Sequence, residues 1–187
     1  MKKVAVFASG SGSNFEAIAE AVGRGDLKAE IELLVCDKPK AKAIERAAGF
    51  NIPAFVFQPK DYDSKVAYEK EILGELKRRE VDFIVLAGYM RLIGETLLSA
   101  YEGRIVNIHP SLLPAFPGKD AIGQAFDAGV KVTGVTIHFV DEGMDTGPII
   151  DQEAVAIDRE DTREQLQKKI QAVEHSLYPK TLAKLLT

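Results

Sequence analysis

The 187-residue chain has the length of one domain, and its 46% hydrophobic and 28% charged residues are typical of a folded globular protein, which excludes a disordered or fibrous chain. Its 24 basic and 28 acidic residues leave a net charge of −4 with no basic run, so nucleic acid is not an expected partner. A single cysteine cannot form an internal disulfide, and no apolar stretch approaches the ~20 residues of a membrane span or resembles a signal peptide. We therefore expect a soluble, cytoplasmic protein without a membrane partner.

Short runs rich in β-branched residues alternate with amphipathic stretches along the chain. The runs predict strands at Val4–Ala8, Ile31–Cys36, Ala54–Phe57, Phe83–Ala87, Arg104–Ile108, Val132–Val140 and Pro148–Ile157. The amphipathic stretches predict helices near Asn14–Val22, Lys40–Ala48, Ser64–Arg79, Glu95–Tyr101 and Ala121–Ala128, and a last helix from about Thr162 to Leu186. Pro179 should kink or restart that last helix.

This alternation predicts an α/β fold, a Rossmann-like open sheet that is mostly parallel and has helices on both faces. Only residues 141–147 separate the last two strands, so we expect these two to form an antiparallel pair. Ligands of such sheets bind at the carboxyl ends of the strands. The loops at that edge are therefore where the functional residues are sought.

The loop after the first strand reads Ser9-Gly10-Ser11-Gly12-Ser13-Asn14 and leads into the first helix. Its glycines allow a tight turn and a close approach to a ligand, and a helix N-terminus supplies free N–H groups, so the loop suits a phosphate. Phe15 replaces the third glycine of a dinucleotide fingerprint, and no Walker sequence follows. The alternative is a plain tight turn with a helix cap.

Two polar side chains, Asn107 and His109, end an otherwise apolar strand and share one of its faces. A carboxylate from the loop 141–147, either Asp141 or Asp145, could hold the imidazole and favour its protonated form. An amide donor, an imidazole and an orienting carboxylate suit an acyl-type transfer through a tetrahedral intermediate. The alternatives are hydrogen bonds to the following turn and a solvated acidic connection. His138 is predicted to be an ordinary sheet residue.

Four segments together resemble the folate-dependent formyltransferases, over essentially the whole chain. They are Gly10-Ser11-Gly12-Ser13-Asn14, Ala87-Gly88-Tyr89-Met90-Arg91, Asn107-Ile108-His109-Pro110-Ser111-Leu112-Leu113-Pro114 and Asp141-Glu142-Gly143-Met144-Asp145-Thr146-Gly147. The resemblance implies an enzyme that uses 10-formyltetrahydrofolate as cosubstrate and requires no metal. It further implies glycinamide ribonucleotide as the formyl acceptor, in a step of de novo purine biosynthesis.

The resemblance also implies roles for particular residues. Asn107, His109 and Asp145 would be catalytic, with Asp145 as the carboxylate beside the histidine. The phosphate of the acceptor would bind to Gly12, Ser13 and Asn14. The folate would contact Lys65, Met90, Arg91, Leu92, Ile93 and Asn107, although Lys65 stands where the family often has Arg. Glu174 would lie near the amine of the acceptor.

We therefore expect residues 1–187 to form one formyltransferase domain, with phosphate binding in its N-terminal half and the folate and catalytic sites in its C-terminal half. A 10-formyltetrahydrofolate hydrolase and a non-catalytic nucleotide-binding module are the alternatives. A pure binding module has no need of Asn107, His109 and Asp145 together. The sequence leaves a monomer and a homodimer open.

Overall fold

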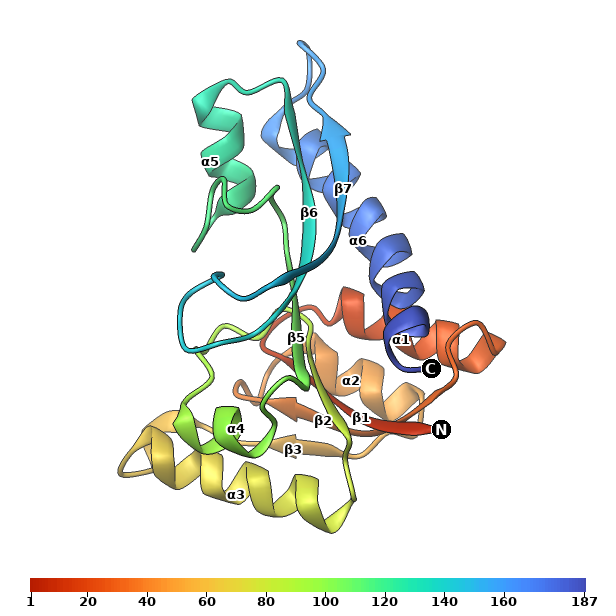
Figure 1. Ribbon diagram of the computed structural model, residues 1–187, viewed down its shortest axis with the longest axis vertical. Coiled ribbons are helices and arrows are strands. Elements are labelled where there is room, and N and C mark those ends of the chain that lie inside the picture. The colour runs from red at the N-terminus through yellow and green to blue at the C-terminus, as the bar shows by residue number, and fades with distance from the viewer.

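A computed structural model describes all 187 residues and shows a seven-stranded sheet in the order β3-β2-β1-β4-β5-β6-β7 (Figure 1). Strands β1 to β5 run parallel to one another, while β6 is antiparallel to both β5 and β7. The strands are β1 (Lys2–Ala8), β2 (Ala29–Cys36), β3 (Ala54–Val56), β4 (Phe83–Leu86), β5 (Ile105–His109), β6 (Val132–Phe139) and β7 (Ile149–Ala156). The predicted fold class is confirmed.

Helices connect the strands and cover both faces of the sheet, as the sequence predicts (Figure 1). They are α1 (Ser13–Arg24), α2 (Lys42–Gly49), α3 (Lys65–Arg78), α4 (Glu95–Ala100), α5 (Ala121–Ala128) and α6 (Arg163–Leu185), with a short 3-10 helix at Pro59–Asp61. Each predicted helix is present, with ends shifted by at most two residues.

The sheet separates two hydrophobic cores. Residues of α1, α2 and α6 bury one face, and residues of α3 and α4 bury the other. Strands β1, β2, β4 and β5 contribute to both cores, which explains why their sequences are apolar at successive positions. The Tyr178 hydroxyl of α6 donates to the Leu86 carbonyl at 2.7 Å and so ties the last helix to the centre of the sheet.

Two features differ from the sequence-based expectation. The last helix does not restart at Pro179 but continues through it to Leu185. Residues on both sides of Pro179, including Tyr178 and Leu182, are buried in the core, and this packing holds the helix together where proline removes one backbone donor.

The second difference is the direction of β6 relative to β5. The predicted antiparallel pair β6–β7 is confirmed, but β6 is antiparallel to β5 as well. His109, the last residue of β5, pairs with Thr136 in the middle of β6. The chain therefore enters β6 beyond the carboxyl end of β5 and returns along it, which places residues of β6 directly beside Asn107 and His109.

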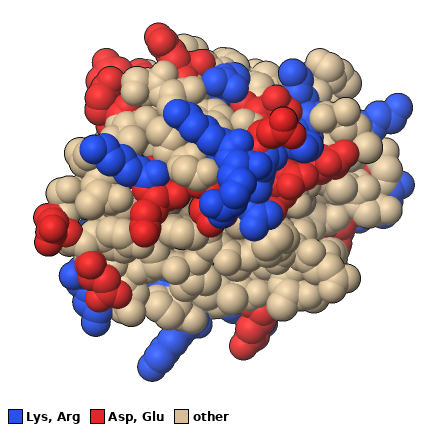
Figure 2. All heavy atoms as spheres, turned by 90° about the horizontal axis from the view of Figure 1, so that it is seen from below, with Lys and Arg blue, Asp and Glu red and all other residues tan.

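Acidic and basic side chains are mixed on the surface around α3. Arg78 and Arg79 both pair with Glu75 of the same helix. On the face seen from below in Figure 2, a central group of Lys and Arg is bordered on several sides by Asp and Glu. None of the helices has the length and apolar character needed to cross a bilayer.

Candidate active site

The loop between β1 and α1 brings the N-terminus of α1 to the carboxyl edge of the sheet. Gly12 caps the helix with a positive φ of 73°, a conformation that favours glycine. A Cβ at this position would lie 2.7 Å from Cα of Ala43 in α2. The Ala43 N–H donates to the Gly10 carbonyl at 3.1 Å, which holds the loop against α2. The first N–H groups of α1 thus stay free of helical acceptors and can bind an anion.

Asn14 in this first turn is bonded to α6. Its side-chain Nδ2 donates to Oε2 of Glu174 at 2.7 Å, and its Oδ1 is buried without a partner. Burial raises the pKa of Glu174 above its usual range, while the Asn14 hydrogen bond acts in the opposite direction. The structure therefore places Glu174 beside the glycine loop, and its side chain has no hydrogen bond to Asn107, His109 or Asp145.

Asn107 and His109 project from the end of β5 onto the same face, as their spacing predicts. Asn107 pairs in register with His138 of β6, and Nδ2 of Asn107 lies 3.4 Å from Nε2 of His138. Nδ1 of His138 lies 2.8 Å from the carbonyl oxygen of Phe139 and so donates to it, while Nε2 also faces Oδ1 of Asp145 at 3.8 Å. In the neutral ring Nε2 accepts from the Asn107 amide. His138 therefore orients Asn107.

Both ring nitrogens of His109 face oxygen atoms. Nε2 lies 2.8 Å from the carbonyl oxygen of Phe116, and Nδ1 lies 3.6 Å from Oδ2 of Asp145. The same Oδ2 accepts from the Gly118 N–H at 2.8 Å, which fixes the carboxylate. His109 and Asp145 are both largely buried, so their attraction is weakly screened by water.

The structure also distinguishes the two aspartates of the loop between β6 and β7. Oδ1 of Asp141 accepts from the Gly143 N–H at 3.0 Å and from the Thr146 hydroxyl at 2.6 Å. These bonds lower the pKa of Asp141, the Thr146 bond having the largest effect. Asp141 shapes the loop, and Asp145 is the carboxylate that faces His109.

The segment between β4 and α4 exposes two large apolar side chains, Met90 at 63% and Leu92 at 50%, whereas Ile93 is buried. The end of β4 lies next to Asn107, because Leu86 and Asn107 are register partners. An exposed apolar surface beside a polar cluster is what an aromatic ligand with one reacting polar group requires. Lys65 does not point freely into this region, since its Nζ donates to the Leu92 carbonyl at 2.7 Å.

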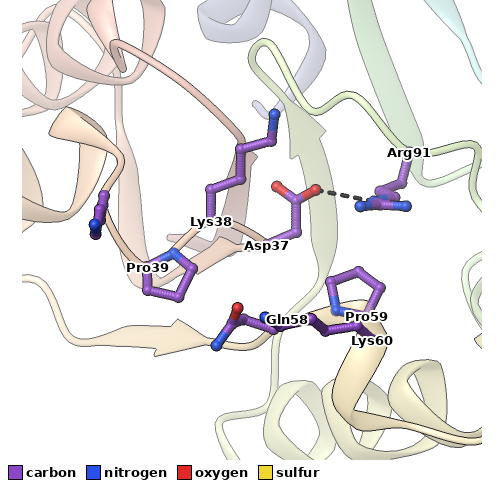
Figure 3. Close-up of a pocket in the computed structure, with 8 residues that line it drawn as sticks. Asp37, Lys38, Pro39, Gln58, Pro59, Lys60 and Arg91 are labelled. Atoms are coloured by element: carbon purple, nitrogen blue, oxygen red, sulfur yellow. Dashed lines mark hydrogen bonds and ion pairs between the residues drawn. The ribbon is translucent and has the colours of Figure 1, made fainter.

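A polar cavity of about 480 Å³ opens at the ends of β2 and β3 (Figure 3). Its lining includes Arg91, whose Nε donates to Oδ2 of Asp37 at 3.0 Å. None of Asn107, His109 and Asp145 lines this cavity. The structure contains no group of three His, Cys, Asp or Glu side chains placed to hold a metal ion.

The predicted site residues thus gather along one edge of the sheet. The glycine loop follows β1, the segment with the exposed apolar side chains follows β4, and Asn107 and His109 end β5. Asp145 lies in the loop between β6 and β7 and reaches His109 from there, although β6 runs in the opposite direction to β5. Sequence reasoning missed His138 as a neighbour of Asn107. Only the antiparallel register of β5 and β6 reveals that contact.

Comparison with known proteins places the molecule in a family. The family model described as formyl transferase matches residues 2–182, so the chain belongs to the formyl transferase family. A phosphoribosylglycinamide formyltransferase from Bacillus subtilis (strain 168) is 61% identical over 186 residues, covering 100% of this chain and 95% of the relative. The trifunctional purine biosynthetic protein adenosine-3 of Homo sapiens is 37% identical over 180 residues, covering 96% of this chain and 18% of the relative.

Solved structures give the same result. The crystal structure of glycinamide ribonucleotide transformylase 1 from Geobacillus kaustophilus matches with a TM-score of 0.98 and 68% identity, covering 100% of both chains. The phosphoribosylglycinamide formyltransferase from Bacillus halodurans matches with a TM-score of 0.97 and 65% identity, covering 100% of this chain and 96% of the other. The resemblance to formyltransferases found in the sequence is confirmed.

Proposed function

We propose that this protein transfers the formyl group of 10-formyltetrahydrofolate to the amine of glycinamide ribonucleotide, giving N-formylglycinamide ribonucleotide and tetrahydrofolate. The observation that carries the proposal is the convergence of Asn107, His109 and Asp145 at one strand edge, in a member of the formyl transferase family. The reaction is a step of purine biosynthesis. The single-domain organisation and the cytoplasmic location expected from the sequence stay predictions.

The reaction begins when the neutral amine of the acceptor attacks the formyl carbon. The C–N bond forms while the formyl C=O becomes a tetrahedral oxyanion. This intermediate collapses by breaking the bond from carbon to N10 of the folate. The amine loses one proton and N10 gains one, so that no net proton is consumed.

Asn107 and His109 supply hydrogen bonds to the oxyanion. The Asn107 amide uses one N–H toward His138 and has a second for the substrate oxygen. For the formyl oxygen to bind Nε2 of His109, it must replace the carbonyl oxygen of Phe116, which lies 2.8 Å from that nitrogen. Asp145 faces Nδ1 and stabilises the positive charge on the ring when Nε2 donates.

The two substrates have separate supports on the same edge. The exposed side chains of Met90 and Leu92 offer apolar surface to the aromatic part of the folate. The N-terminus of α1, with Gly12, Ser13 and Asn14, offers N–H donors to the phosphate of the acceptor. Asn14 holds Glu174 next to this loop, which supports contact of Glu174 with the part of the acceptor close to the phosphate rather than with its amine.

The test is an absorbance assay of 10-formyltetrahydrofolate conversion with and without glycinamide ribonucleotide. We expect conversion only when the ribonucleotide is present, together with formation of the formylated product. Equal conversion in its absence would replace the proposal by a hydrolase, with water as the acceptor. No conversion by folded protein would instead indicate another acceptor or a binding module.

A further inference from the structure

Residues 88–94 belong to the segment that joins β4 to α4 and form neither helix nor strand. The backbone of such a segment lacks regular partners, and groups from other parts of the chain, most of them side chains, provide them here. The Gly88 carbonyl accepts from the Ser9 N–H at 3.0 Å, and the Met90 N–H donates to the Ser9 hydroxyl at 2.9 Å. Further along, the Leu92 carbonyl and the Gly94 N–H are bonded to side chains of α3.

Asp37, directly after β2, anchors the first half of the segment. Its side chain is 0% exposed. Oδ1 accepts from the Ser9 hydroxyl at 2.5 Å, and Oδ2 accepts from Nε of Arg91 at 3.0 Å (Figure 3). One buried carboxylate thus orients both Ser9, which receives the Met90 N–H, and the side chain of Arg91.

Glu69 of α3 anchors the second half. The residue is only 2% exposed, and its Oε2 accepts from the Gly94 N–H at 2.8 Å while its Oε1 has no partner. Lys65, one helical turn earlier, holds the Leu92 carbonyl. A Cβ on Gly94 would lie 2.7 Å from Oε1 of Glu69 and 2.9 Å from Cδ of Lys65. The absence of a side chain at Gly94 therefore allows α3 to approach this closely.

Burying a carboxylate is costly, and an apolar side chain of similar volume often stabilises a protein equally well. Stability alone is thus a weak reason for two buried carboxylates at the ends of one segment. A carboxylate does, however, impose a direction on the N–H groups that it accepts, and this fixes an irregular backbone in one conformation.

We propose that Asp37 and Glu69 are positioning residues that hold Met90–Ile93 in the conformation that receives the folate. Neither residue touches the reacting atoms. The proposal rests on the proposed function, because that function makes this segment the folate surface. Preorganised surfaces bind more tightly because less ordering is required on binding.

The test compares the steady-state kinetics of Glu69→Ala and Glu69→Gln with those of the unaltered protein. The alanine variant loses a charge-assisted bond to the segment, and we expect its KM for 10-formyltetrahydrofolate to rise about tenfold. Its kcat and its KM for glycinamide ribonucleotide should change less than about twofold. The glutamine variant keeps an oxygen that accepts from Gly94 and should restore the folate KM. Asp37→Ala should raise the folate KM to a similar extent.

Asp82→Ala provides the matched control. Oδ2 of Asp82 also accepts a backbone N–H, that of Lys3 at 2.8 Å, but at the opposite edge of the sheet. This variant loses the same kind of bond, so it should be less stable yet keep the unaltered folate KM. Hydrogen exchange of residues 88–94 should become faster in Glu69→Ala and remain unchanged in Asp82→Ala.

An unchanged folate KM in Glu69→Ala, or an equal rise in Asp82→Ala, would overturn the proposal. If Glu69→Ala does not fold, Glu69→Leu keeps a side chain of similar volume without the carboxylate, and an unchanged folate KM there would have the same consequence. These failures are distinct from failure of the proposed function, in which the unaltered protein would not transfer the formyl group at all.

Discussion

At the residue scale, the two polar side chains at the end of β5 are each held in one orientation by neighbouring groups. Asn107 is held by His138, and His109 lies between the Phe116 carbonyl and Asp145. Donors that are already oriented stabilise a developing oxyanion without a reorganisation cost at the moment of reaction. Such preorganisation would explain why both proposed donors lie at the end of a strand rather than in a loop.

The first prediction concerns Asn107→Ala, which removes one of the two proposed oxyanion donors. We expect kcat to fall about a hundred- to a thousandfold, as is typical for the loss of one such donor. Initial rates at saturating concentrations of both substrates measure the effect. Asn51→Gly is a suitable control. It removes an exposed side-chain amide, and glycine readily adopts the backbone φ of 57° found at this residue. Near-normal turnover of Asn107→Ala would remove this residue from the mechanism.

The second prediction concerns Gly12→Ala. The positive φ and the 2.7 Å approach to Ala43 make any side chain at this position strained, at a cost of about 1–3 kcal/mol. The loop must shift, so we expect a higher KM for glycinamide ribonucleotide and a lower melting temperature. Gly10→Ala, only two residues away, meets no atom within 4 Å and should have little effect on either quantity. Equal effects of the two substitutions would contradict this reading of the loop.

At the element scale, local signals and tertiary packing contribute differently to each helix. Helix α6 begins with a capping box, in which the Thr162 side chain accepts from the Gln165 N–H and the Gln165 side chain accepts from the Thr162 N–H. The C-terminal half of α6 is instead stabilised by burial of its side chains in the core, and this packing keeps the helix continuous at Pro179. The start of α6 is therefore readable locally, whereas its continuation is not.

The third prediction tests that cap. Thr162→Ala removes the acceptor for the Gln165 N–H and should lower the free energy of unfolding by about 1 kcal/mol. For a protein of this size the melting temperature should then fall by roughly 2–4 °C. Activity should stay unchanged, because the cap contacts no site residue. Thr187→Ala at the exposed C-terminus is the control and should leave the melting temperature where it was.

At the scale of the whole molecule, two buried carboxylates, Glu69 and Glu174, make stability depend on pH. Burial raises the pKa of both, which means that the folded protein favours their neutral forms more than the unfolded chain does. A carboxyl group with a raised pKa contributes stability below its ordinary value near 4.5, and this contribution is lost as the pH rises through the folded-state value.

The fourth prediction follows for Glu174→Gln. The glutamine amide cannot ionise, so the variant does not lose stability in this way. The difference in free energy of unfolding, variant minus unaltered protein, should therefore increase as the pH rises above 4.5. Urea unfolding of both proteins at several pH values measures the difference. For Glu153→Gln, at an exposed position of β7, the difference in free energy of unfolding from the unaltered protein should stay nearly constant over the same pH range. A difference for Glu174→Gln that shrinks with rising pH would have the wrong sign and refute the argument.

The sequence by itself determined the elements, the fold class and most of the candidate site. Hydrophobic periodicity and glycine placement are local properties, so the strands, the helices and the tight glycine loop after the first strand could be predicted from them. The motif around Asn107 and His109 identified the family for the same reason.

The spacing of the residues left Asp141 and Asp145 open, the family resemblance implied Asp145, and the tertiary structure shows Asp145 facing His109. Only the tertiary structure shows that His138 lies against Asn107 and that Asp37 and Glu69 are bonded to the segment after β4. These contacts join residues 25 to 54 positions apart, or lie across two strands whose direction no local pattern specifies. They depend on sheet register and on the close approach of helices. Sheet register and helix approach are set by the packing of the entire chain, so they cannot be read from any short stretch of sequence.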